Sequence, residues 1–158
     1  MVNKMGEEFF KKENIFIQES FQDYESALTF LSEYLRSKGK VEDGFKKALL
    51  EREENYPTGL LVGDINVAIP HVDHQYVKES EVLLCTLEEP IPFRRMDLPE
   101  EEVDVSVIIL LAIDSPDGHL GMLKQIIGFV QNQEVLKKMV KEKDKDSVSK
   151  ILNEFFNS

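Results

Sequence analysis

The sequence has little of what several functional classes require. It contains a single cysteine, Cys85, which excludes an internal disulfide and a thiolate metal cluster. The longest apolar candidate, from Val103 to Ile113, is interrupted by Asp104 and Ser106 and falls short of the roughly 18 residues of a membrane span. Residues 1–8 show no apolar stretch of the secretory kind. We therefore expect a cytoplasmic protein that does not insert into a membrane.

Positive charge is also scarce in this chain. Lysine and arginine number 19 against 30 aspartates and glutamates, so that the formal net charge is −11. This balance argues against binding to nucleic acid or to an anionic membrane surface, because both are themselves negative. It allows a basic protein partner to be attracted electrostatically, although the same charge can simply keep the protein in solution.

Signatures of nucleotide-dependent and hydrolytic enzymes are missing. Gly59, Gly63, Gly118 and Gly121 fit neither the phosphate-binding P-loop nor the dinucleotide fingerprint. A Gly-x-Ser-x-Gly nucleophile elbow is absent as well. The three histidines are therefore the residues on which a catalytic hypothesis must be built.

The apolar pattern predicts one α/β domain over residues 1–158, with its core over about residues 14–157. We expect helices over 23–37, 42–55, 119–131, 134–141 and 146–156, and strands over 14–17, 66–69, 81–87 and 103–113. Turns are expected at 90–93 and 115–118, where prolines interrupt the pattern. Residues 107–113 are apolar at every position, which is typical of a central strand covered on both faces. The prediction is a mixed β-sheet flanked by helices on both faces.

His71 follows Ala68-Ile69-Pro70 at the predicted exit of a strand. Proline fixes its own φ and lacks a backbone donor, so it ends strand pairing and presents the next side chain from a rigid position. A nucleophile must be both held and accessible, and His71 meets this requirement. The alternative is an ordinary surface histidine after a strand.

Two further side chains suit an anion. His119 begins a predicted helix, where free N–H groups and the helix dipole favour negative charge. Arg52, near the end of an earlier predicted helix, can clamp a phosphate with two donors. The alternatives are a helix-cap histidine and a surface ion pair between Arg52 and a nearby glutamate.

A metal site built from His71, His74 and His119 is a poorer hypothesis. His71 and His74 are spaced as His-x-x-His with Asp73 between them. Zinc requires three or four ligands with supporting hydrogen bonds, and no cluster of further histidines or cysteines is present in the sequence. We expect His74 to be a solvated loop residue and the protein to need no metal or other cofactor.

Two blocks of sequence together resemble a known family. The segment 52–60, Arg-Glu-Glu-Asn-Tyr-Pro-Thr-Gly-Leu, is followed by Val-Ala-Ile-Pro-His at 67–71. A long apolar strand, a turn and His119-Leu120-x-x-Leu123 come later. These blocks resemble enzyme IIA domains of the bacterial phosphoenolpyruvate-dependent sugar phosphotransferase system, in its mannitol/fructose superfamily, over roughly residues 15–156. Segments 56–60 and 91–96 resemble the galactitol-type branch, whereas many mannitol and fructose members have a glycine after the histidine that corresponds to His71.

The resemblance implies a phosphotransferase with a phosphohistidine intermediate. His71 is then expected to accept a phosphoryl group from the phosphohistidine of HPr and to pass it to a cysteine of enzyme IIB, while the sugar enters through the membrane enzyme IIC. His119 and Arg52 are expected to stabilise the phosphoryl oxygens, and Thr58 to be a weaker contact to the substrate. An alternative of the same fold is a regulatory phosphoprotein that signals through its phosphorylation state.

Overall fold

A mixed β-sheet of five strands forms the centre of the fold. The computed structural model describes residues 10–156, and for residues 117–120 the course of the backbone alone. The strands are β1 (Ile15–Glu19), β2 (Gly59–Leu60), β3 (Val67–Ala68), β4 (Glu81–Arg94) and β5 (Glu102–Ala112). Their order across the sheet is β1-β4-β5-β3-β2. The β1–β4 and β3–β5 pairs are parallel, while β4–β5 and β2–β3 are antiparallel.

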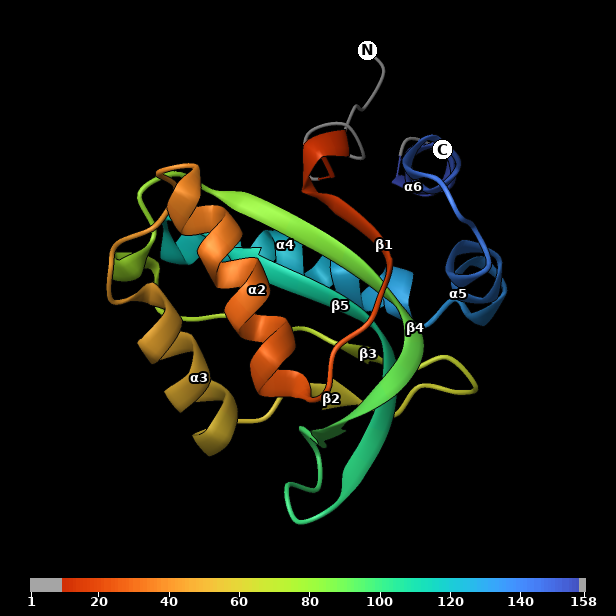
Figure 1. The fold of residues 1–158 in the computed structure, drawn as a ribbon, viewed down its shortest axis with the longest axis horizontal. Helices are drawn as coiled ribbons and strands as arrows, with labels where there is room; N and C mark the ends of the chain where they lie inside the picture. The colour runs from red at the N-terminus through yellow and green to blue at the C-terminus, as the bar shows by residue number, and fades with distance from the viewer. Residues whose placement is uncertain (1–9, 157–158) are drawn as a thin grey trace.

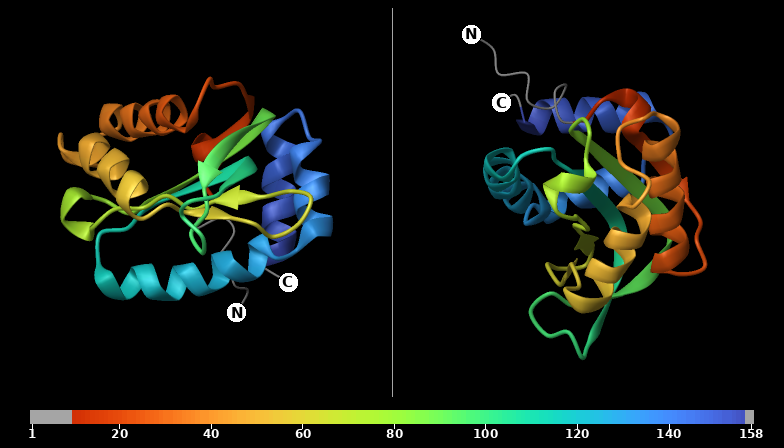
Figure 2. Two further views of the ribbon diagram at one scale, coloured as in Figure 1. Left: turned by 90° about the horizontal axis from the view of Figure 1, so that it is seen from below. Right: turned by 90° about the vertical axis from the view of Figure 1, so that its left-hand side faces the viewer.

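Helices cover both faces of this sheet (Figures 1 and 2). One face carries α2 (Tyr24–Ser37) and α3 (Phe45–Asn55), and the other carries α4 (Pro116–Val130), α5 (Gln133–Val140) and α6 (Lys145–Phe156). Side chains of β5 alternate between the two cores: Ile108 and Leu110 pack with α2 and α3, whereas Ile109 and Leu111 pack with α4 to α6. The predicted α/β architecture, with its doubly covered central strand, is confirmed.

The two helices of the first layer begin and end for local reasons. Asp23 accepts a hydrogen bond from Ser26 N at 2.8 Å and caps α2, so the helix starts close to the predicted residue 23. The predicted start of α3 at about Glu42 is wrong, and the helix begins at Phe45. Val41 forms a bridge with Val77, and Glu42 N donates to Tyr76 O at 2.9 Å, so this segment pairs with a distant loop. The commitment of Glu42 to a distant loop residue could not be read from helical periodicity.

Two predicted turns prove to be regular structure. Strand β4 continues through residues 90–93 and pairs with β5 from Ile91 to Arg94 after a register shift. Its partner β1 stops pairing at Leu87, so this half of β4 has an open edge, where prolines are tolerated. Helix α4 begins at Pro116 rather than His119, since proline suits the first position of a helix.

The hairpin of β2 and β3 brings the candidate histidine to the sheet. Gly59 pairs with Ala68 and Leu60 with Val67, and β2 was not predicted from the sequence. A Cβ atom at Gly59 would lie 2.7 Å from the carbonyl oxygen of Arg94, so only glycine permits this close approach. The hairpin thereby packs against the far half of β4 and fixes the path of β3.

Candidate functional site

His71 lies at the end of the sheet, three residues after the end of β3. The carbonyl oxygen of Pro70 accepts from Leu111 N at 3.0 Å, and His71 forms an isolated parallel bridge with Leu111. Pro70 and Val72 are buried, while His71 itself is half-buried. The backbone on both sides of the histidine is therefore held. The expectation that Pro70 ends strand pairing is wrong, because its carbonyl group and His71 still pair with Leu111 of β5.

One ring nitrogen of His71 has a defined partner. Nδ1 lies 2.9 Å from the carbonyl oxygen of Ile69. A carbonyl oxygen can only accept, so Nδ1 carries the proton in this contact. In the neutral ring, Nε2 then carries the nucleophilic lone pair. The backbone two residues earlier thus selects both the tautomer and the orientation of the imidazole.

Arg52 lies beside the segment that follows His71. Its Nη1 atom is 3.9 Å from Asp73 Oδ1, and its guanidinium lies over the ring of Tyr56 at 5.4 Å from the centroid. The Nε atom is buried and has no hydrogen-bond partner among the residues that the structure describes. An open cavity of about 190 Å³ is lined here by Arg52, Asp73, Tyr56, Val72, Tyr76, Ala48, Glu51 and Asn55. The ion pair of Arg52 is formed with Asp73, whereas the alternative from sequence was a nearby glutamate.

Thr58 is buried against Glu53, a residue that the sequence analysis did not single out. Thr58 N donates to Glu53 Oε2 at 2.8 Å, and the hydroxyl donates to Oε1 at 2.9 Å and to Oε2 at 3.2 Å. Glu53 is only 4% exposed. Burial raises the pKa of its carboxyl, although the donors of Thr58 and the charges of Arg94 and Arg52 act in the opposite direction. The hydroxyl of Thr58 is therefore engaged by a carboxylate.

The predicted role of His119 falls on a side chain outside the described residues. Its backbone lies in the first turn of α4, which begins at Pro116, a few residues beyond the end of β5 and the bridge between His71 and Leu111. Sequence and backbone therefore put the start of this helix at the same end of the sheet as His71. Stabilisation of a phosphoryl group by His119 stays a prediction.

His74, the remaining histidine, is exposed in the short 3₁₀ turn η2 (His74–Tyr76). Among the side chains that the structure describes, no group of three or more histidines, cysteines, aspartates or glutamates is arranged to hold a metal ion. Within the same part of the chain, no helix has the length and apolar character needed to span a bilayer.

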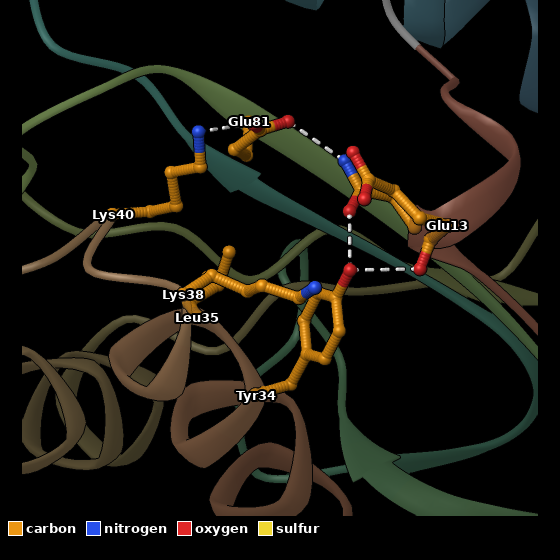
Figure 3. Close-up of a pocket in the computed structure, with 7 residues that line it drawn as sticks. Glu13, Tyr34, Leu35, Lys38, Lys40 and Glu81 are labelled. Carbon is orange, nitrogen blue, oxygen red and sulfur yellow. Dashed lines mark hydrogen bonds and ion pairs between the residues drawn. The ribbon is translucent and has the colours of Figure 1, made fainter.

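A second pocket, of about 220 Å³, lies between the C-terminal part of α2 and the start of β4. It is lined by Glu13, Asn14, Tyr34, Leu35, Lys38, Lys40 and Glu81 (Figure 3). Glu81 is buried there and accepts from Asn14 Nδ2 at 2.7 Å, from Lys11 Nζ at 3.1 Å and from Lys40 Nζ at 3.3 Å. Burial raises the pKa of Glu81, but these partners outweigh it and hold the pKa below its ordinary value. The polar groups of this pocket satisfy one another, so its role is to join segments of the fold.

Comparisons with known proteins agree with the fold. The family model described as "Phosphoenolpyruvate-dependent sugar phosphotransferase system, EIIA 2" matches residues 8–155. The galactitol-specific EIIA component of Escherichia coli K12 is 29% identical over 129 residues, which cover 80% of this chain and 85% of that protein.

Two solved structures from Escherichia coli share the fold. The mannitol IIA protein is 24% identical with a TM-score of 0.73, covering 89% of this chain and 96% of the other. The IIA–mannitol protein in complex with phosphorylated IIB–mannitol is 23% identical with a TM-score of 0.75, covering 91% and 98%. The family model extends over almost the entire chain, and the predicted family is thereby confirmed. The chain belongs to the EIIA 2 family of the phosphoenolpyruvate-dependent sugar phosphotransferase system.

Proposed function

We propose that this chain carries a phosphoryl group on Nε2 of His71, between a phosphohistidine donor and a cysteine acceptor. The observation that carries the proposal is the contact of 2.9 Å between His71 Nδ1 and the carbonyl of Ile69. This contact leaves the lone pair on Nε2 and fixes the ring at the end of a strand. Membership of the EIIA 2 family supports a phosphotransfer activity in general.

The two transfers balance without a further reactant. In the first, the Nε2 lone pair attacks phosphorus, an N–P bond forms, and the N–P bond to the donor imidazole breaks. In the second, a thiolate of the acceptor attacks the same phosphorus, an S–P bond forms, and the bond to Nε2 breaks. Phosphoryl transfer has a loose transition state, so positioning and charge stabilisation supply most of the catalysis.

Arg52 is proposed to offset the charge of the phosphoryl oxygens. Its contact with Asp73 is long, at 3.9 Å, and its side chain is about one-third exposed, so it can turn toward an arriving phosphate without breaking a tight ion pair. A planar guanidinium offers two parallel donors to such a group. His119, in the first turn of α4, is proposed as a second donor.

The partners follow from the family and from the relatives. HPr is proposed as the donor and enzyme IIB as the acceptor, with transfer on the cytoplasmic side. The membrane enzyme IIC is proposed as an indirect partner. The solved complex of a mannitol IIA protein with phosphorylated IIB supports a IIB acceptor. The galactitol-specific relative supports a polyol of the galactitol type as the transported substrate.

A labelling experiment tests this function directly. Incubation with phosphoenolpyruvate, enzyme I and HPr is expected to give acid-labile, alkali-stable phosphate on the protein, and addition of a galactitol-type IIB is expected to remove it. His71→Ala should abolish the label, whereas His74→Ala, which changes an exposed neighbour, should retain it. Undiminished labelling of the His71→Ala protein would refute the assignment.

A further inference from the structure

We propose that Glu53 and Thr58 are a positioning pair for His71, acting through a chain of hydrogen bonds that ends on the Nδ1 atom of its ring. This inference rests on the proposed function, because it takes His71 as the nucleophile. It assigns to Thr58 a role different from direct contact with the phosphoryl group. It also gives a role to Glu53, a buried carboxylate in the last turn of α3.

The burial of Glu53 needs an explanation. Its neighbours Glu51 and Glu54 are exposed on the same helix, whereas Glu53 is 4% exposed. A carboxylate loses hydration in such a place and is retained only where hydrogen bonds compensate. Both of its oxygens receive donors from Thr58, through the backbone N–H and the hydroxyl. The pair spans the connection between α3 and β2, and it fixes where β2 starts.

From Thr58 the chain continues to the histidine in two steps. The carbonyl oxygen of Thr58 accepts from Ile69 N at 3.3 Å, and the carbonyl oxygen of Ile69 lies 2.9 Å from His71 Nδ1. The first hydrogen bond joins the two arms of the β2–β3 hairpin, and the second lies just beyond β3. A displacement of Thr58 therefore moves the acceptor that sets the tautomer and orientation of the His71 ring.

The same pair fixes Arg52 relative to His71. Arg52 immediately precedes Glu53, and its carbonyl oxygen accepts from Tyr56 N at 2.6 Å, which closes the end of α3. Glu53 thus connects the turn that bears the cation to the strand that leads to the nucleophile. A single buried contact sets the geometry of two groups on which phosphoryl transfer depends, and errors of about 1 Å in such geometry can cost roughly 100-fold in rate.

The position of the Thr58 hydroxyl separates the two roles open to this residue. A direct phosphate contact requires the hydroxyl proton to point at the incoming group, but this proton is directed at Glu53, with Oγ1 2.9 Å from Oε1. Thr58 is also only 2% exposed. The geometry therefore favours a role in which Thr58 positions His71 and does not contact the phosphoryl group.

The test uses Thr58→Val, which keeps the shape of the side chain and removes the hydroxyl, and Thr58→Ser, which restores the hydroxyl. Glu53→Gln replaces an acceptor by a donor, and Glu54→Gln is the matched control on the exposed face. The first readout is ¹⁵N NMR of the His71 ring in the unphosphorylated full chain at about pH 8, where the neutral tautomers are compared. The second is the rate of transfer from phospho-HPr, separated into kcat and KM.

We expect wild type, Thr58→Ser and Glu54→Gln to hold the Nδ1–H tautomer and to transfer at rates within about threefold of one another. Thr58→Val and Glu53→Gln should shift the tautomer balance and lower kcat about 10- to 100-fold with KM within about twofold. A folded Thr58→Val protein with an unchanged tautomer and unchanged kcat would overturn the proposal, as would a loss of kcat without any change in tautomer.

The NMR readout needs no phosphoryl donor, so it tests the hydrogen-bond chain even if His71 were never phosphorylated. Labelling of His71→Ala tests the function separately. If Thr58→Val does not fold, Glu53→Gln with Glu54→Gln as its control decides the question, since Glu53→Gln retains the volume of the side chain.

Discussion

Two buried glutamates, Glu53 and Glu81, show how the same side chain can serve different purposes in one molecule. Glu53 and Glu81 are 4% and 5% exposed, so both lose hydration to a similar extent. Glu81 receives two lysines and an asparagine, and its pKa lies below the ordinary value in spite of burial. Glu53 is bound directly by Thr58, and burial leaves its pKa above the ordinary value.

The difference lies in what each carboxylate connects. Glu81 joins Lys11 and Asn14, which lie 70 and 67 residues away in the sequence, and so fastens the N-terminal part of the described chain to β4. Glu53 contacts a residue five positions away, next to the candidate site. Where cations offset the lost hydration of the carboxylate, as at Glu81, the contact holds distant segments together strongly. Where neutral donors offset it, as at Glu53, the nearby arginine stays available for a ligand.

The largest expected difference between the two regions is the effect on catalysis of removing Arg52, near Glu53, or Lys40, near Glu81. We expect Arg52→Ala to remove about 2–4 kcal/mol of transition-state stabilisation, which corresponds to a transfer rate lower by roughly 30- to 1,000-fold. Lys40→Met, which removes a cation beside Glu81, should leave the rate of the folded protein within about twofold. Single-turnover transfer from phospho-HPr measures both, and equal losses in the two variants would contradict the contrast.

Loss of the Glu81 carboxylate should have the largest effect on stability. Glu81→Ala leaves the buried Asn14 amide without its acceptor at 2.7 Å and separates two lysines from their partner. We expect a loss of about 3 kcal/mol in the free energy of unfolding, measured by urea denaturation. Glu79→Gln changes an exposed partner of Lys40; it is the control and should cost less than about 1 kcal/mol. Phosphoryl transfer by folded Glu81→Ala should be nearly normal.

Much of this arrangement could be predicted from local patterns, and the failures have a common cause. The strand over residues 103–113 was predicted because its apolar run is a local signal, and His71 because proline precedes it. Strand β2 and the far half of β4 were missed because their pairing depends on Gly59 and on the open edge beyond β1. Such long-range contacts leave no periodicity in the sequence.

The same holds for the site. Glu51, Glu53 and Glu54 form an acidic run at the end of a helix, and only tertiary packing shows which of them faces inward. The available signal was Thr58, five residues after Glu53 and directly after Pro57 at the helix end. Asp73 as the partner of Arg52 was equally hidden, since the two residues belong to different elements.

The pH dependence of stability should have opposite signs in the two regions. The pKa of Glu81 is lowered by folding, so its contribution is present above the unfolded pKa and lost as the pH falls through the folded pKa. The pKa of Glu53 is raised by folding, so stability is greater below the unfolded pKa and decreases as the pH rises through the folded one.

Urea unfolding of wild type, Glu81→Gln and Glu53→Gln from about pH 3.5 to 7 checks these signs against the ordinary glutamate pKa near 4.3. The stability of wild type relative to Glu81→Gln should increase with pH over the acid part of this range. Relative to Glu53→Gln it should decrease with pH. If both stability differences changed with pH in the same direction, the opposite pKa shifts of Glu53 and Glu81 would be contradicted.

The smallest expected effect concerns a hydroxyl at the edge of the Glu81 cluster. Tyr34 Oη lies 2.8 Å from the carbonyl oxygen of Glu13 and 3.0 Å from Asn14 Oδ1 (Figure 3), so one proton is shared between two acceptors. Tyr34→Phe removes this proton, while the Asn14–Glu81 contact remains. We expect a loss of about 1 kcal/mol in the free energy of unfolding with an unchanged rate of phosphoryl transfer. Because Asn14 is buried, a loss as large as that of Glu81→Ala would mean that the tyrosine, rather than the carboxylate, organises this region.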